Sequence, residues 1–571
     1  MNRSVTMVAA ALLVLTGSLL GDVFASRIRV TNPDGSAFDG KFNDGTGMKV
    51  TYILNDTATI VEVKVYNAAT NALAATLSAS NQGRGEHSQT WDGTGSAGGQ
   101  KYYVRIQTTQ PVRSNDAYKA YYFQNTADVA PISRGIFTRG VDVNNNMDSK
   151  GFGYWYASAS DPSSNDGYKT GTLRYNPDGS FAGSEAGHPM LTNTLGTGNG
   201  GTFNWGSTAP WTTALDAAGR VYQVSNGGNF ITRLDHDTAA PKIIIRNVTA
   251  PRGVYAVGSG ANLKLYIAAD TVVWRANIGT SDTLTTPLEL VASLGTYVRD
   301  VIIDDAGYML VTLRTGTTGT VPGYIERYDI SGTLPKKRID AAFSLSHSTG
   351  QPVCFALNHG PDRNSASDDT IYYSIRGTNG SDTNNIGIHQ IVNAESAFPE
   401  AKRIFKSGDV PGSLGGNNNA NADIALDWAG NLIWFENSNE EIFMVAPPRA
   451  GSSVTRVTKG YDTVTVSGAT SVGSGGLTPD AFALHQNFPN PFNPSTQIAY
   501  TLPANGTVTV EVYDILGNRI AELYSGSASQ GYHAVQWNAA GAASGMYLYR
   551  VTAQLNDGRS FTDAKRMLLL K

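Results

Sequence analysis

Short segments of alternating apolar and polar residues run along most of the chain, and turn-forming residues separate them. Strict alternation over roughly four to eight residues predicts a strand that buries one face in a core. Gly accounts for 62 of the 571 residues, and abundant glycine is typical of many short strands joined by tight turns. Because this length exceeds what one hydrophobic core supports, the pattern predicts an all-β protein of several domains.

The beginning and the end of the chain share one strand pattern. Four pairs of segments correspond in order: 50–54 with 498–502, 61–66 with 508–513, 85–91 with 531–537, and 102–106 with 547–551. Short strands of period two that end at turns favour an immunoglobulin-like β-sandwich. We therefore predict one sandwich at 26–110 and another at 482–571, with Trp91 and Trp537 in their cores.

A different sequence motif recurs within residues 111–456. It occurs at 214–222, 302–310 and 425–433, and it consists of two apolar residues, Asp, any residue, Ala, Gly, any residue and two more apolar residues. Asp and Gly suit the first and fourth positions of a type I turn, so each copy is a hairpin. Looser copies lie between them. The shorter spacings fit a four-stranded blade of roughly 40–50 residues, whereas the longer ones imply loop insertions or a further blade. The pattern predicts a central β-propeller of six blades, with seven or eight as alternatives, and a Gly/Ser-rich linker at 457–481.

The last segment carries four motifs in a fixed order. They are an Asn-Pro-Phe-Asn-Pro opening, Val-Tyr-Asp-Ile-Leu-Gly at 512–517, Gly-Met-Tyr at 545–547, and a basic and apolar end at 565–571. Together these motifs resemble the type A C-terminal sorting domain of proteins exported by the Type IX secretion system. The resemblance implies export by that machinery, with the following sorting-signal residues: Pro489, Asn490, Pro491, Gly545, Tyr547 and Lys565.

Two further resemblances concern the other domains. The two sandwiches resemble the Ig-like domain of the flagellar hook-capping protein (FlgD-like), a module that recurs in secreted proteins. The Asp-x-Ala-Gly hairpins broadly resemble those of the six-bladed NHL and lactonase-like propellers.

The N-terminus is typical of a secretory signal peptide spanning residues 1–25. Arg3 supplies a basic start, residues 8–20 are apolar, and small or modest residues precede a cut near Ala25. The apolar run is short for a membrane span, so we expect none after signal removal. The net charge of -4, without a dense basic run, argues against nucleic acid as a partner. The expected location is extracellular or the outer-membrane surface of a Gram-negative bacterium.

Two sets of residues are candidates for binding chemistry. Asp142, Asn144, Asn146 and Asp148 place oxygen atoms at alternate positions, as a calcium loop does, although the loop departs from the EF-hand pattern. A polar turn is the alternative, and calcium is the only cofactor considered. The aromatic residues Trp155, Trp205 and Trp211 lie near Asn-rich segments and are candidate glycan platforms, with core packing as the alternative.

Catalytic motifs do not emerge from the sequence. Cys354 is the single cysteine, which excludes an intrachain disulfide, and its apolar neighbours predict a buried residue. The histidines lack zinc-binding spacings and no Gly-x-Ser-x-Gly elbow occurs, so no catalytic residue is assigned. We expect a non-enzymatic binding or surface-structural module, with a surface glycan or another surface protein as partner. The alternative is an extracellular enzyme (a metal-dependent hydrolase, lactonase or polysaccharide lyase) with its site in the propeller channel.

Overall fold

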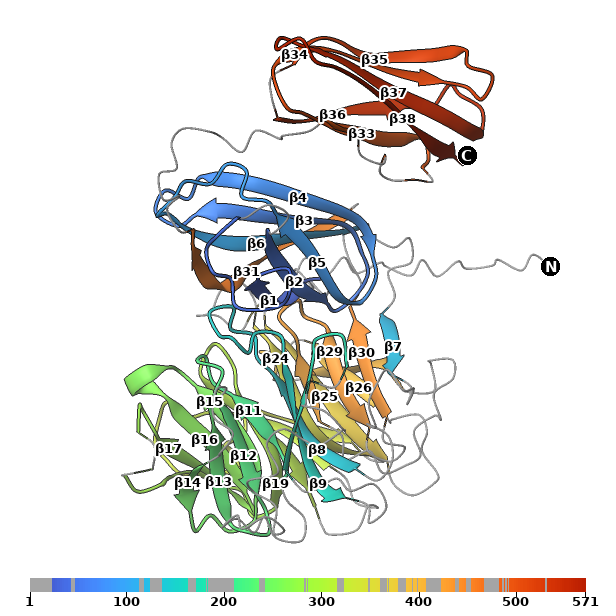
Figure 1. The fold of residues 1–571 in the computed structure, drawn as a ribbon. Helices are drawn as coiled ribbons and strands as arrows, with labels where there is room; N and C mark the ends of the chain where they lie inside the picture. The colour runs from blue at the N-terminus through green and yellow to red at the C-terminus, as the bar shows by residue number, and fades with distance from the viewer. Residues whose placement is uncertain are drawn as a thin grey trace, which may run out of the picture. The chain divides into compact units, whose positions relative to one another are not determined.

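The chain forms two compact units, 1–467 and 468–571. The computed structural model describes the following residues, apart from short gaps within some ranges: 23–42, 47–111, 118–123, 136–162, 171–182, 210–235, 242–359, 367–406, 423–436, 441–447, 453–466 and 482–570. Strands dominate this part of the chain, with 3-10 turns at Gly260–Asn262 and Arg338–Asp340 (Figure 1). No helix within the described ranges is long and apolar enough to cross a membrane.

The N-terminal sandwich consists of two antiparallel sheets. The first has the order β1 (Ala25–Thr31), β2 (Met48–Leu54), β5 (Gly85–Trp91). The second has the order β31 (Ser453–Thr465), β6 (Lys101–Pro111), β3 (Ala58–Asn67), β4 (Leu73–Gln82). Alternate residues of these strands form one core, in which Trp91 is buried as predicted.

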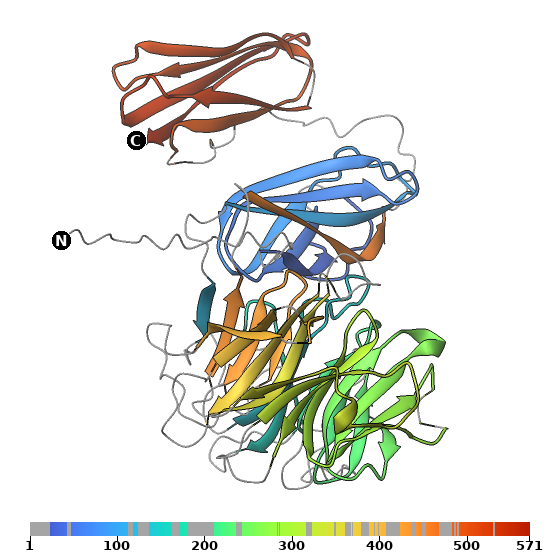
Figure 2. The ribbon, with the colours of Figure 1, turned by 180° about the vertical axis from the view of Figure 1, so that it is seen from behind.

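The propeller is inserted into this sandwich, between β6 and β31. The register of that pair runs from Ser453 opposite Pro111 to Thr465 opposite Lys101, so a strand that follows the propeller completes the sheet (Figure 2). The expected linker start at residue 457 is therefore wrong, because 457–465 belong to β31. Val and Thr residues here favour a strand, and the Ser/Gly-rich composition begins only at Ser467.

Six sheets of the described region form the propeller. They are listed here in chain order. Blade 1 is β8 (Ile136–Val143), β9 (Trp155–Pro162) and β10 (Gly171–Tyr175). Blade 2 is β11 (Thr213–Leu215), β12 (Val221–Ser225), β13 (Phe230–Leu234) and β14 (Lys242–Arg246). Blade 3 is β15 (Pro251–Val257), β16 (Lys264–Ala269), β17 (Val272–Asn277) and β18 (Glu289–Ser293), extended by the short parallel strand β22 (Lys336–Lys337).

Blade 4 is β19 (Tyr297–Ile303), β20 (Tyr308–Arg314), β21 (Gly323–Asp329) and β23 (Phe343–His347). Blade 5 is β24 (Gly350–Asn358), β25 (Thr370–Gly377), β26 (Gly387–Val392) and β27 (Glu400–Phe405). Blade 6 is β28 (Ile424–Leu426), β29 (Leu432–Glu436), β30 (Glu441–Ala446) and β7 (Lys119–Phe123).

The ring closes although each sheet by itself is open. The first strand of every blade contacts the first strand of the next, and β28 contacts β8. Blade 6 takes its outer strand from the start of the ring, because β7 pairs with β30 from Lys119 opposite Ala446 to Phe123 opposite Ile442 (Figure 1). The prediction of a six-bladed propeller is confirmed by this arrangement.

The predicted Asp-x-Ala-Gly turns have the expected geometry. Asp216 Oδ1 accepts hydrogen bonds from the backbone N–H groups of Ala218 and Arg220 at 2.9 and 3.0 Å. Asp427 makes the same two bonds in blade 6. The glycine of each turn has a positive φ, which a residue with a side chain rarely adopts.

The C-terminal unit repeats the topology of the N-terminal sandwich. One sheet is β32 (Ala483–Leu484), β33 (Ser495–Leu502), β36 (Gly531–Asn538), and the other is β35 (Arg519–Ala528), β34 (Gly506–Tyr513), β37 (Gly545–Leu555), β38 (Ser560–Leu569). The pair β33–β36 matches β2–β5, and β38 takes the place of β31. Trp537 is buried in this core, as the sequence repeat predicts.

The first described residues are part of the core of the first unit. Val23, Phe24 and Ala25 are buried, and Phe24 packs on Phe152 and Trp428 of the propeller. The backbone N–H of Phe24 also donates to Asn55 Oδ1 at 2.8 Å. A signal-peptide cut after Ala25 would remove these contacts.

Candidate functional site in the propeller channel

A cavity of about 420 Å³ lies on the axis of the propeller. The first strands of all six blades line it, through residues that include Val141, Ala214, Val254, Val301, Phe355 and Ile424. Its volume is within the range of ordinary small-molecule sites. The lining belongs to the later part of each first strand, so the cavity lies toward the end of the channel where these strands finish.

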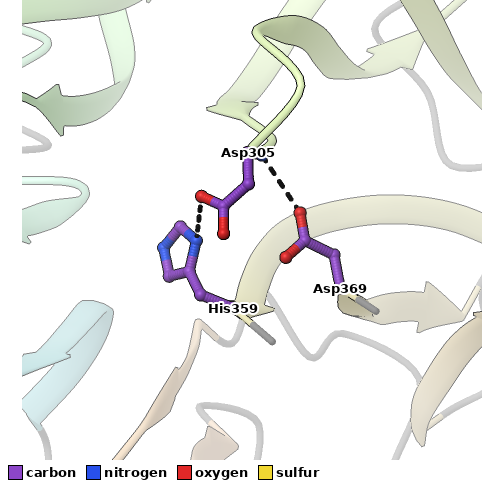
Figure 3. Close-up of side chains that lie close together, drawn as sticks. All are labelled: Asp305, His359 and Asp369. Atoms are coloured by element: carbon purple, nitrogen blue, oxygen red, sulfur yellow. Dashed lines mark hydrogen bonds and ion pairs between the residues drawn. The ribbon is translucent and has the colours of Figure 1, made fainter. Parts of the chain in front are cut away.

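Two carboxylates and an imidazole meet beside this cavity (Figure 3). Asp305 is in the turn after β19, His359 directly follows β24, and Asp369 directly precedes β25. The Nδ1 atom of His359 is 2.7 Å from Asp305 Oδ1, and the backbone N–H of Asp305 donates to Asp369 Oδ2 at 3.0 Å. The three residues are half-buried, and one ligand atom from each lies within 4.8 Å of the others.

This arrangement supports two kinds of chemistry. The Nδ1–Oδ1 separation of 2.7 Å is that of a hydrogen-bonded histidine–aspartate pair, and it leaves Nε2 3.4 Å from the hydroxyl of Tyr255. Tyr255 and His359 both line the cavity. One imidazole nitrogen and two carboxylate oxygens are also ligands that Zn²⁺ and other divalent first-row metals accept. We name these residues, Asp305, His359 and Asp369, the rim cluster.

Three other carboxylates in the channel wall join neighbouring blades. Asp142 of blade 1 accepts the backbone N–H of Leu215 in blade 2 at 2.6 Å. Asp300 of blade 4 accepts that of Phe355 in blade 5 at 2.9 Å. Asp423 of blade 6 accepts that of Val141 in blade 1 at 3.1 Å, across the ring closure.

Burial governs the charge of these wall carboxylates. Loss of solvation raises the pKa of Asp142 and of Asp300 to about 7, and it raises the pKa of Asp423 well above its usual value. The backbone N–H bonds oppose this effect only in part. Because at least one oxygen of each group holds the next blade, we assign these residues to the ring and not to a ligand.

The residues of the predicted calcium loop face different surroundings. Asp142 is in the channel wall, whereas Asp148 is exposed and forms an ion pair with Lys459 at 3.5 Å. Between them, Asn144 Oδ1 and Asn146 Oδ1 accept hydrogen bonds from backbone N–H groups two residues later. These are the bonds of a polar turn, and calcium binding at this loop stays a prediction.

The predicted glycan platforms do not share one surface. Trp155 is 0% exposed and packs in the core between blades 1 and 6, so the assignment of this residue to glycan binding is wrong. Its strand faces a core on that side, and large aromatic residues are usually buried. Trp205 lies outside the described residues. Trp211 is half-buried beside several arginines near the start of the first strands.

Cys354 is buried, as the sequence predicts. Its sulfur lies 2.9 Å from Ser374 Oγ, and burial raises the pKa of the thiol well above its usual value. A thiol in this state is a poor nucleophile.

The described sorting-signal residues secure the end of the C-terminal sandwich. Asn490 Oδ1 accepts the backbone N–H of Leu568 in β38 at 2.8 Å. Tyr547, in the strand that begins at Gly545, packs on Trp537 with ring centroids 5.3 Å apart. Lys565 lies in β38. Pro489 and Pro491 are outside the described residues.

The rim cluster was not predicted from the sequence. Asp305 stands in a turn motif that already explained its neighbour Asp304, and His359 and Asp369 belong to another blade. The position of these residues in the sequence could have indicated the cluster, because all three follow or precede a strand at the same end of the channel. Testing which polar residues follow the first strand of each blade would have found Asp305 and His359.

Comparison with known families accounts for both sandwiches. Residues 35–111 match the FlgD Ig-like domain, and residues 486–560 match the secretion system C-terminal sorting domain. The second match indicates that the type IX secretion machinery exports this protein to the cell surface or the medium. No curated protein matches the chain.

Several solved structures are similar to the propeller part. Virginiamycin B lyase from Staphylococcus aureus is 12% identical with a TM-score of 0.32, covering 58% of this chain and 99% of the lyase. A putative gluconolactonase is 11% identical with a TM-score of 0.36, covering 61% and 96%. The WD40 repeats of RRP9 are 8% identical with a TM-score of 0.36, covering 60% and 100%. At these scores the similarities carry no argument, and the six-sheet ring rests on its own strand pairing.

Proposed function

We propose that the propeller of this exported protein is a binding module for a small polar ligand at the cell surface or in the medium. The observation that carries the proposal is the cavity of about 420 Å³, lined by all six blades, with the rim cluster beside it. The rim cluster supplies oxygen and nitrogen ligands for a divalent cation. A hydroxyl or carboxylate oxygen of the ligand would then complete the coordination from the cavity side.

Metal titration tests this proposal. The full-length protein, treated with a chelator and dialysed, is titrated separately with Zn²⁺, Mn²⁺ and Ca²⁺ by calorimetry. We expect one site whose affinity falls at least about 100-fold in the Asp305→Asn/Asp369→Asn double variant, because two anionic ligands become neutral amides. Glu400→Gln is the matched control, since Glu400 is exposed on β27. Equal affinity in the double variant and the control would exclude the rim cluster as a metal site.

A second candidate function is catalysis at the same site. It is favoured by one observation: Asp305 engages Nδ1 of His359, and Nε2 lies 3.4 Å from the hydroxyl of Tyr255, which also lines the cavity. A histidine held in this way can act as a general base. Turnover of a lactone or a glycan ester that is lost in His359→Gln would establish catalysis. Stoichiometric binding of the same compound without turnover would instead support the binding module.

A further inference from the structure

One end of the C-terminal sandwich exposes large apolar side chains. Ile515 and Leu516, in the turn between β34 and β35, are 69% and 82% exposed. Met546, the second residue of β37, and Leu570, directly after β38, are 48% and 51% exposed. Leu568, near the end of β38, is partly exposed. We name these five residues the apolar tip.

Strand pairing brings the members of the apolar tip together. Met546 is directly opposite Leu568, and the Cβ atoms of such a pair are about 5 Å apart. Both side chains are on the outer face of the sheet, because their neighbours in sequence, Tyr547 and Met567, belong to the core. The register of β34 with β37, continued past its last pair, also brings Ile515 level with Met546. Segments that are distant in the sequence therefore form one apolar surface.

The N-terminal sandwich has the same topology without these residues. The sequence repeat aligns 61–66 with 508–513 and 102–106 with 547–551, and the four equivalent positions hold small or polar residues that are exposed. They are Ala68 for Ile515, Ala69 for Leu516, Lys101 for Met546 and Thr465 for Leu568. Thr465 is opposite Lys101, just as Leu568 is opposite Met546. The sandwich fold therefore does not require large apolar residues at this end.

The two sandwiches also differ in their family matches. The first matches the FlgD Ig-like domain, and the second matches the secretion system C-terminal sorting domain. The apolar tip comes from three of the motifs that resemble the sorting domain, which are Val-Tyr-Asp-Ile-Leu-Gly, Gly-Met-Tyr and the basic and apolar end. Buried residues of the same motifs, such as Tyr547, form the core. The exposed residues between them have no such role, and the partner of a sorting domain is the export machinery.

Charged residues lie further along the same outer face. Glu511 of β34 forms ion pairs with Arg550 of β37 at 2.8 Å and with Arg519 of β35 at 3.0 Å. These pairs join three strands directly beside the apolar tip. An apolar centre with a polar rim is the usual anatomy of a protein–protein interface, and contiguous exposed apolar residues mark interaction sites.

We propose that the apolar tip is the surface by which the tail docks on a component of the type IX secretion machinery, and that its place there is a hydrophobic groove. The buried residues of the sorting motifs build the sandwich, whereas the apolar tip makes the contact. This docking is independent of any ligand of the propeller, because the tail is a separate compact unit.

Exchanging the apolar tip for the residues of the first sandwich tests the proposal. The full-length variant Ile515→Ala/Leu516→Ala/Met546→Lys/Leu568→Thr is produced in a bacterium that has the type IX machinery, and cell fractionation measures its exported and periplasmic amounts. We expect the exported-to-periplasmic ratio to fall at least about 10-fold, because a few central residues supply most of the binding energy of an interface.

A control variant makes matched changes at exposed apolar residues of the first unit. Its substitutions are Ile60→Ala, Leu73→Ala, Ile339→Lys and Val457→Thr. We expect this control to be exported like wild type. Wild-type export of the tip variant, while deletion of 482–571 still blocks export, would overturn the proposal and leave the sorting role of the tail intact.

Two measurements separate docking from folding. The purified tip variant should keep the thermal unfolding profile of wild type, because each new residue already occupies the equivalent position of the first sandwich. Whether or not it does, a photo-crosslinking residue at position 516 of the otherwise unchanged chain probes the wild-type fold in living cells. We expect crosslinks to a component of the machinery, identified by mass spectrometry, and none from position 339. A product that joins two copies of this chain, or no product, would overturn the proposal.

Discussion

Replacing Asp142 by asparagine should change how the stability of the propeller depends on pH. The carboxyl group of Asp142 accepts backbone N–H bonds from Val143 and Leu215 at 2.8 and 2.6 Å, so it joins blade 1 to blade 2. Burial raises the pKa of this group to about 7 in the folded protein. In the unfolded chain the pKa of an aspartate is about 3.9.

The sign of the effect follows from these two pKa values. Between about pH 4 and pH 7 the folded state holds a proton on Asp142 that the unfolded state has lost. The contribution of Asp142 to the free energy of unfolding is therefore greatest in acid, and it is lost as the pH rises toward 7. Since one pKa unit corresponds to about 1.4 kcal/mol, the loss between about pH 4 and pH 7 is about 3 kcal/mol.

Asp142→Asn removes this titration but keeps the shape of the side chain. The amide retains one acceptor oxygen, so one of the two backbone N–H groups loses its partner at a cost of about 1–3 kcal/mol at every pH. We expect the variant to be less stable than wild type near pH 4 and to approach or exceed it near pH 7. Urea unfolding followed by tryptophan fluorescence at several pH values measures the difference.

The pH dependence of the difference in unfolding free energy between variant and wild type tests this reasoning. If the free-energy difference between variant and wild type stays within about 0.5 kcal/mol from pH 4 to pH 7, Asp142 is ionised throughout and the reasoning fails. Asp178→Asn, in a turn after blade 1, is the matched control. Comparing the two variants separates the effect at Asp142 from the general effect of replacing one aspartate by asparagine.

Four further predictions concern other parts of the chain. Proline at both Ala120 and Tyr121 should destabilise the propeller in chemical denaturation by about 1–3 kcal/mol, because one of these two neighbouring N–H groups faces β30 and its loss leaves an acceptor there without a partner. Phe24→Ala should cost about 3–5 kcal/mol, and N-terminal sequencing of the exported protein should find its start before Val23. Cys354 should resist an aromatic disulfide reagent until the protein is unfolded, because the thiol is buried; rapid labelling of the native protein would contradict this. Deletion of 482–571 should leave the protein in the periplasm, as cell fractionation would show; its secretion would refute the role of the tail.

The sequence predicted local structure well because alternation and turn chemistry act over a few residues. The Asp-x-Ala-Gly hairpins and the strand repeat between the two sandwiches are of this kind. The pairing of β31 with β6 was not predicted, because no local sequence pattern shows which distant strand pairs with β31. The rim cluster was missed for the same reason, since Asp305 and His359 are 54 residues apart. Trp155 was misassigned because an aromatic residue on a strand looks the same whether its side faces solvent or a neighbouring blade.

Closure of the propeller and completion of the N-terminal sandwich support each other. Ser453 pairs with Pro111 in the sandwich, and Ala446 pairs with Lys119 in blade 6. Without the ring, bringing residues 111 and 453 together closes a loop of about 340 residues. Once β7 has paired with β30, only about a dozen residues separate the two ends.

Loop-closure entropy scales with the logarithm of length, so the closed ring lowers the cost of adding β31 by about 3 kcal/mol. The reverse also holds, since β31 on β6 brings β7 and β30 close together. A proline in β7 should therefore loosen the distant β31 as well as blade 6. Hydrogen exchange of residues 453–465 in that variant would reveal the coupling, which two independent domains would not have.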